Sequence, residues 1–325
     1  MLKGFGSVRL STLVGLLVAA AGMTSAAAMT NAFVGYLQAF AEVDRLTAMT
    51  LTVVALGAIA AIGIAESVAV ASVITLIEIF GLLLVVGVNW GSFALLPARI
   101  GEFLPPADFA GWGPILAGAM LAFYAFLGFE DMVVVAEEVK NARRSLPLAI
   151  LATLAITTVL YLLVMTVALL AMAPAELAAG EAPLAALYEK GSGASPMPIN
   201  AIAAVAILNG ALVQIIMASR MLYGLASKRQ IPAVLAYVNP RTHTPLLATL
   251  VTTLLILLLS LPGTLRGLAQ ATSIVMLTVF ALVNLSAWRV KRSMPAERGL
   301  RFVPAWVPLA GFLITVAFVL RELAP

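Results

Sequence analysis

The chain contains 325 residues, of which 62% are hydrophobic and only 10% carry a charge. Soluble domains are typically about half apolar and a quarter charged, so this composition excludes an ordinary water-soluble domain. The absence of cysteine excludes disulfide bonds, a thiolate nucleophile and a thiolate metal site. The net charge of +4 comes from residues at the ends of apolar segments rather than on one solvated face, so nucleic acid is not an expected partner.

Charge-poor stretches long enough to cross a membrane follow one another along the chain, since a span needs about 20 mostly apolar residues. Each is expected to be a helix, because an open strand leaves backbone groups unsatisfied in lipid. We therefore predict an all-α polytopic membrane protein of about nine transmembrane helices, with residues 1–325 forming one domain. The stretches cover residues 10–40, 46–65, 67–96, 109–130, 146–173, 198–219, 245–265, 267–288 and 302–320.

The basic residues predict the orientation of these helices. When the loops are assigned alternately to the two sides, 14 of the 19 basic residues fall on the side of the N-terminus. Cytoplasmic loops are enriched in Lys and Arg, so we expect a cytoplasmic N-terminus, an outside C-terminus and a multi-pass protein of the cell (inner) membrane, with lipid as its surroundings. The other side holds only Arg45, Arg99, Lys190, Arg266 and Arg321.

The N-terminal segment also has features of a secretory signal peptide. Lys3 and Arg9 precede an apolar stretch, and the small residues at 25–28 resemble a cleavage site. The apolar run nevertheless continues to Phe40 without a charge, which favours a retained span over a cleaved signal.

One apolar stretch contains two adjacent acids, Glu130 and Asp131. About 20 residues separate Gly111 from Glu130, and four apolar residues follow the pair, so both acids are expected deep in the membrane. A charged acid at that depth costs on the order of 2.5–3.5 kcal/mol. The pair therefore needs a water-filled cavity, a partner or a proton.

Two interpretations fit this stretch. In the favoured one, the helix breaks near Gly128, and the unwound backbone leaves carbonyl and amide groups free to coordinate a polar solute. In the other, Glu130 and Asp131 mark the end of the span, and residues 132–140 form an interfacial helix.

The acidic pair belongs to a longer motif, made of the runs FYAFLGFED at 123–131, AEEVKN at 136–141 and RRSLP at 143–147. These runs closely resemble the sixth helix and following loop of the permeases of the amino acid/polyamine/organocation (APC) superfamily, with Ala142 where the family usually has proline. Further segments resemble its fifth helix, the end of its eighth helix and the loop after it, at 66–88, 219–226 and 231–245.

The resemblance implies an inverted-repeat (5+5) secondary transporter fold, in which the first helix of each repeat is broken at the substrate site. Residues 1–100 then correspond to helices 3–5, the remnant of the first repeat. Residues 109–289 correspond to helices 6–10, the second repeat, and residues 302–320 to an extra helix 11. Helices 1 and 2 have no counterpart here, so half of the substrate's ligands are expected to be missing.

The resemblance also implies secondary active transport of an amino acid, coupled to protons. The sixth helix would offer its carbonyls to the substrate's ammonium group and its aromatic side chains to the rest of the substrate. Glu130 would take part in proton coupling, whereas Asp131 would cap the following helical segment. For each aromatic residue the alternative is packing against lipid or a neighbouring helix. The expected substrate-binding residues are Phe123, Tyr124, Ala125, Phe126 and Gly128.

Glu78 is another acid expected within the membrane, since no charged residue lies between Glu66 and Arg99 apart from Glu78 itself. Many relatives that use protons rather than sodium carry Lys at about this position, so the sign of the charge is reversed here. We hypothesise that Glu78 titrates as part of the proton-coupling pathway, because burial disfavours its charged form. The alternative is a neutral acid that is hydrogen-bonded to a neighbouring helix.

Other function classes lack their motifs. With no Cys and only one His, His243 in a loop, no enzyme, catalytic residue, metal site or cofactor is expected. No repeated pore loop or charged ring indicates a channel. Two alternatives remain open: a truncated or accessory permease fragment without transport activity by itself, and a polyamine or organocation transporter of the same fold.

Overall fold

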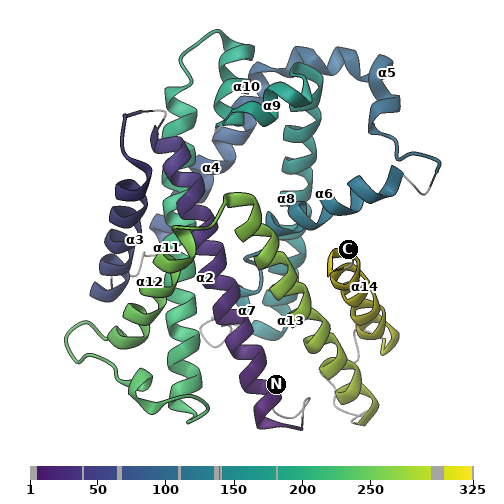
Figure 1. The fold of residues 1–325 in the computed structure, drawn as a ribbon. Helices are drawn as coiled ribbons and strands as arrows, with labels where there is room; N and C mark the ends of the chain where they lie inside the picture. Colours follow the sequence, from purple (N-terminus) through teal and green to yellow (C-terminus); the bar gives the residue numbers. More distant parts are fainter. Residues whose placement is uncertain are drawn as a thin grey trace.

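The computed structural model describes residues 6–38, 40–63, 68–108, 111–134, 139, 141–180, 182–293 and 304–323. Within these ranges the chain forms helices and no strand (Figure 1). The predicted all-α fold is therefore confirmed. Part of the family motif, at 136–138 and 140, lies outside the described residues, as does Glu66.

The longest helices form the centre of the bundle. Helix α2 (Val8–Gln38) runs through the middle of the view and packs along α11 (Met197–Ser227) and α13 (Leu265–Ser293) (Figure 1). Its packing surface consists largely of small residues, and residues 26–28, all alanine, are fully buried. Small side chains let helix backbones approach closely, which strengthens van der Waals contacts where lipid offers no hydrophobic driving force.

The remaining helices surround this centre. Helices α3 (Arg45–Ile62) and α12 (Leu246–Ser260) pack against each other and against α2 and α11. Helix α4 (Val68–Val88) packs on α8 (Ala142–Ala171) and α11, while α14 (Trp306–Leu323) lies along α13. The shorter elements are η1 (Trp90–Leu95), α5 (Leu96–Arg99), η2 (Ile100–Phe103), α6 (Trp112–Tyr124), α7 (Asp131–Val134), α9 (Pro174–Ala179), α10 (Pro183–Ser192) and η5 (Ala233–Ala236).

Each of the nine predicted stretches contains a helix, but not every helix is a full span. Helices α2, α3, α8, α11 and α13 are long and apolar enough to cross a membrane by length and composition. Helix α4 would make a sixth span together with the segment at 90–103, which bends away by 56°. Helices α6 and α12 are apolar but shorter, so a count of about nine spans stays a prediction.

The end of α3 is held by the loop that precedes α12. Gly63 caps α3 in the left-handed conformation, with φ +78°. The Thr244 hydroxyl donates a hydrogen bond of 2.7 Å to the Ala61 carbonyl. A Cβ atom at Gly63 would lie only 2.7 Å from the Thr242 carbonyl oxygen. Both the backbone angle and the available space therefore favour glycine at this position.

We predict that Gly63→Ala destabilises the protein by about 1–2 kcal/mol, because alanine must adopt the left-handed conformation and push against Thr242. The measurement is the midpoint of thermal unfolding in detergent. Gly224→Ala is the matched control, since a Cβ there meets nothing within 4 Å and alanine favours a helix interior. Equal midpoints for the two variants would contradict the prediction.

Candidate functional site

The apolar segment that carries the acidic pair is broken. Helix α6 ends at Tyr124, α7 begins at Asp131, and the residues at 125–130 form turns between them. Gly128 lies in this break with φ +122°, a conformation that side-chain-bearing residues rarely adopt. The break therefore lies where the favoured interpretation of the sequence expected it. We call residues 125–130 the break.

The break leaves backbone acceptors free. The amides of Ala125, Phe126 and Leu127 bond to the carbonyls three residues earlier, at 3.0, 3.0 and 3.2 Å, which tightens the end of α6. The Ala125 carbonyl accepts a hydrogen bond of 2.9 Å from the Tyr161 hydroxyl of α8. No hydrogen bond from any described residue reaches the carbonyls of Phe126 and Leu127. These two oxygens can accept a bond from a solute.

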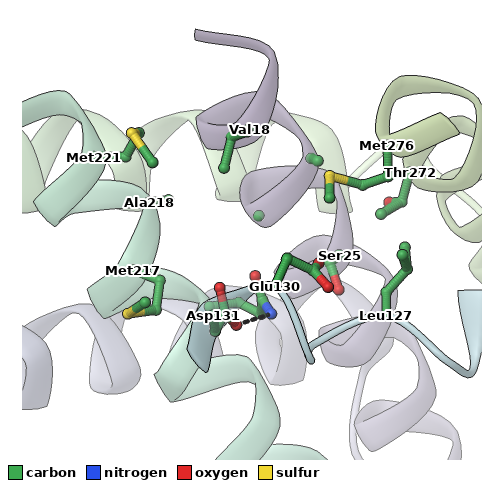
Figure 2. A pocket seen from close by; sticks show the side chains of 13 residues that line it. Val18, Ser25, Leu127, Glu130, Asp131, Met217, Ala218, Met221, Thr272 and Met276 are labelled. Carbon is green, nitrogen blue, oxygen red and sulfur yellow. Dashed lines mark hydrogen bonds between the residues drawn. The ribbon is translucent and has the colours of Figure 1, made fainter. Parts of the chain in front are cut away.

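The two acids line one pocket between the break, α2, α11 and α13 (Figure 2). The Glu130 carboxylate folds back and accepts a hydrogen bond of 2.8 Å from the Gly128 amide. The Gln214 side chain of α11 donates to the Asp131 carboxylate at 3.2 Å. The other residues of the wall are Val18, Ala21, Gly22, Ser25, Leu127, Met217, Ala218, Met221, Thr272 and Met276.

The size of this pocket limits what it can hold. The space open to the centre of a water molecule is only about 20 Å³, which is room for about one water. Two carboxylates beside one water can hold or pass a proton, but an amino acid would need the walls to move apart. No group of three or more described His, Asp or Glu side chains could hold a metal ion.

The structure directs the predicted aromatic residues toward three different helices. The Tyr124 hydroxyl lies 3.2 Å from the Ser25 hydroxyl of α2. The Phe123 ring packs edge-on against Phe280 of α13, with 6.0 Å between centroids. The Phe126 ring packs edge-on against Tyr161 of α8, with 5.2 Å between centroids.

The predicted substrate residues are thus split. Ala125, Phe126 and Gly128 line a pocket on the side of α8 together with Leu127 and Tyr161, whereas the acidic pocket is a separate one. A role for these residues in binding substrate stays a prediction.

Glu78 faces a third cavity, between α2, α4, α8 and α11. It is half-buried, and no hydrogen bond or ion pair joins it to another described residue. The cavity also contains the side chains of Tyr36 and Tyr161, while most of its wall is apolar. The predicted acids Glu78 and Glu130 therefore lie in different cavities, and Tyr161 reaches from the cavity of Glu78 to the break.

Several partners of the break were missed by the sequence analysis. The sequence predicts that Asp131, as one of the acidic pair, needs a cavity, a partner or a proton, but nothing in the sequence identifies Gln214 of α11 as that partner. Tyr161 and Phe280 each stand in a long apolar run that contains no polar pattern to single them out. Phe280 contacts Phe129 as well as Phe123, with 5.6 Å between the centroids of the Phe129 and Phe280 rings. Only their tertiary contacts identify them.

Comparison with known proteins agrees with this architecture. A family model described as "Amino acid permease" matches residues 3–321. An uncharacterized transporter of Mycobacterium tuberculosis is 32% identical over 271 residues, which cover 82% of this chain and 59% of that protein. Cationic amino acid transporter 4 of Homo sapiens is 33% identical over 226 residues, covering 69% of this chain and 34% of that protein.

A bacterial permease of named substrate also matches. The branched-chain amino acid permease BcaP of Bacillus subtilis is 26% identical over 237 residues, which cover 72% of this chain and 49% of that protein. The chain thus spans about three fifths of the mycobacterial transporter and a smaller share of the other two relatives.

We predict that Gly128→Ala loosens the break. The new Cβ meets nothing within 4 Å, so any effect comes from the backbone angle of +122°, whose strain is worth about 1–3 kcal/mol. Hydrogen–deuterium exchange of the peptide at 125–131 should become faster. Gly118→Ala, in α6 and equally free of steric contact, is the control. Unchanged exchange in Gly128→Ala would show that the break does not depend on glycine.

Proposed function

Since the chain belongs to the amino acid permease family, we propose that it acts in secondary active transport of amino acids across the cell membrane, coupled to protons. The observation that supports this most is the break between α6 and α7, which exposes unbonded carbonyls beside two carboxylates within an apolar bundle. Unwound helices at the middle of a membrane are a recurrent way to bind polar substrates.

In this proposal the break is the substrate site. The free carbonyls of Phe126 and Leu127 accept hydrogen bonds from the substrate's ammonium group. The rings of Tyr124 and Phe126, with Phe123 behind them, contact the rest of the substrate after the walls have moved apart. Gly128 supplies the backbone angle that turns the chain out of α6.

The acids are assigned to proton coupling. Glu130 shares its pocket with Asp131, and two carboxylates in one small pocket do not both ionise readily, so a proton is held there. Each acid accepts one hydrogen bond, Glu130 from the Gly128 amide and Asp131 from Gln214, so these bonds do not decide which of the two carries the proton. We assign the proton to Glu130 because the resemblance to the family links an acid at this position to proton coupling. Glu78, without a partner among the described residues, is a second titrating group.

The topology follows the family pattern in this proposal. Residues 1–100 correspond to helices 3–5 of the first repeat, residues 109–289 to helices 6–10 of the second, and residues 302–320 to helix 11. The N-terminus lies in the cytoplasm and the C-terminus outside, because most of the basic residues are on the side of the N-terminus.

A second candidate function is that of an accessory fragment that does not transport by itself. The split of the proposed site between two pockets favours it, since Ala125, Phe126 and Gly128 do not line the pocket that holds the acids. The names of the relatives suggest basic and branched-chain amino acids as the first substrates to test, with polyamines as the remaining class.

The proposal is tested with purified protein. We expect basic or branched-chain amino acids to raise the unfolding midpoint, and proteoliposomes to take up the same compounds when an inward proton gradient is imposed. A protonophore should abolish that stimulation. Stabilisation without uptake would favour the accessory role, and the absence of both would overturn the proposal.

We predict that Glu130→Gln keeps amino acid binding but loses the stimulation of uptake by a proton gradient, because the amide cannot release a proton. Glu176→Gln is the control. Glu176 is exposed and pairs with Lys190 at 3.1 Å, and the hydrogen bond from Lys190 lowers the pKa of Glu176, so it stays ionised. Gradient-stimulated uptake by Glu130→Gln would remove Glu130 from the coupling pathway.

For Glu78 we predict a change in the pH dependence of uptake. Glu78→Gln fixes the side chain in a neutral form of nearly the same shape, so a contribution of this carboxyl group to the pH profile should disappear. Uptake is measured over a range of external pH at constant gradient. A profile identical to that of the unmodified protein would leave Glu78 with a packing role only.

A further inference from the structure

Tyr161 contacts the break and also lines the cavity of Glu78. Its hydroxyl donates to the Ala125 carbonyl in the break at 2.9 Å, and its ring packs edge-on against Phe126. The same side chain lines the cavity of Glu78. Tyr161 is thus in contact with the break and shares a cavity with a titratable acid of α4.

Few groups can compete for the Tyr161 hydroxyl. Around the cavity of Glu78, the other titratable side chain on the described residues is Tyr36 of α2. The contributions from α10 and α11 to this wall are apolar: Leu184, Ile199, Ile202, Ala203, Ala206 and Ile207. Tyr161 and Glu78 line the same cavity, and no described residue donates a hydrogen bond to the Glu78 carboxylate.

The Tyr161 hydroxyl has one proton to donate. The two candidate acceptors are the Ala125 carbonyl, to which it is bonded, and the Glu78 carboxylate, which lines the same cavity. A neutral Glu78 is a weak competitor, so the hydroxyl stays on the Ala125 carbonyl, as in the structure. An ionised Glu78 is the better acceptor, because a hydrogen bond to a charged group is roughly twice as strong as one between neutral groups. An ionised carboxylate in an apolar cavity is costly in free energy unless a donor forms a hydrogen bond with it.

We propose that Tyr161 is a positioning residue that switches its hydrogen bond between the Ala125 carbonyl and the Glu78 carboxylate, and so ties the shape of the break to the charge of Glu78. With Glu78 neutral, Tyr161 tethers the break to α8. With Glu78 ionised, the tether is released and the break opens. This inference rests on the proposed titration of Glu78, but it does not require that the chain transports amino acids.

A single introduced cysteine can report the opening of the break, because the chain has no native Cys. Leu127 suits this purpose, since its side chain lies between the acidic pocket and the pocket that Tyr161 lines. The rate at which a small methanethiosulfonate reagent modifies Leu127→Cys is measured in detergent from acidic to mildly alkaline pH. Dividing each rate by the fraction of the introduced thiol that is thiolate at that pH, measured from the thiolate absorbance of the same variant, removes the pH dependence of the thiol itself.

The switch predicts a distinct result for each variant. With Tyr161 and Glu78 intact, the normalised rate should rise by about tenfold as Glu78 ionises, which corresponds to one charge-assisted hydrogen bond. Tyr161→Phe should be fast at all pH values, because the tether is absent. Glu78→Gln should be slow at all pH values, because the tether is permanent. The double variant should behave like Tyr161→Phe, since Tyr161 acts after Glu78.

The matched control is Tyr36→Phe, which removes the other phenolic hydroxyl of the same cavity and should keep the full pH response. A retained pH response in Tyr161→Phe, or its loss in Tyr36→Phe, would overturn the proposal. If Tyr161→Phe does not fold, Glu78→Gln still tests the proposal. At acidic pH, a faster modification of Leu127→Cys with Glu78→Gln than of Leu127→Cys alone would overturn the proposal as well. This experiment measures thiol modification and not uptake, so it tests the Tyr161 switch even if the protein does not transport amino acids.

Discussion

The structure depends on one constraint: lipid offers no hydrogen bonds, so an interrupted helix in a membrane must find partners for its backbone within the protein. The break at 125–130 meets this constraint in part. The Gly128 amide donates a hydrogen bond to the Glu130 carboxylate, and the Tyr161 hydroxyl donates one to the Ala125 carbonyl. The unbonded carbonyls of Phe126 and Leu127 are the groups to which we assign the binding of a polar solute in the proposed function.

The helices around the break provide a scaffold that can hold such an interruption. Helix α2 packs against the other central helices through small residues, and its polar side chains form hydrogen bonds with other elements. Asn31 donates to the Ser260 carbonyl of α12 and accepts from Arg45, while Thr24 pairs with Thr272 of α13. Each such bond is worth about 0.6 kcal/mol, but together they fix the position of α2 against the break.

The helical fold and the place of the break could be predicted from the sequence, because both are local properties. Long apolar runs specify helices, and Gly128 beside two acids marks an interruption. The partners could not be predicted. A membrane helix can be apolar on every face, so the sequence of α8 does not reveal which face meets the break. Helix α13 carries polar residues such as Thr272, but they do not identify Phe280 as a partner of the break. Tyr161 and Phe280 therefore looked like ordinary residues of apolar spans, although they contact the predicted site directly.

The separation of the acids between two cavities has a mechanistic consequence. Glu130 belongs to the break and accepts a hydrogen bond from the Gly128 amide, and Asp131 accepts one from Gln214 of α11. Glu78 instead shares a cavity with Tyr161 of α8, whose hydroxyl donates to the Ala125 carbonyl of the break. Coupling between two ligands requires an element whose conformation both of them bias. In the two proposals made above the break is such an element, since protonation of Glu130 would change its bond with the Gly128 amide, and protonation of Glu78 would change the bond of Tyr161 to the Ala125 carbonyl. Under these proposals two protonation events would act on the same six residues from different directions.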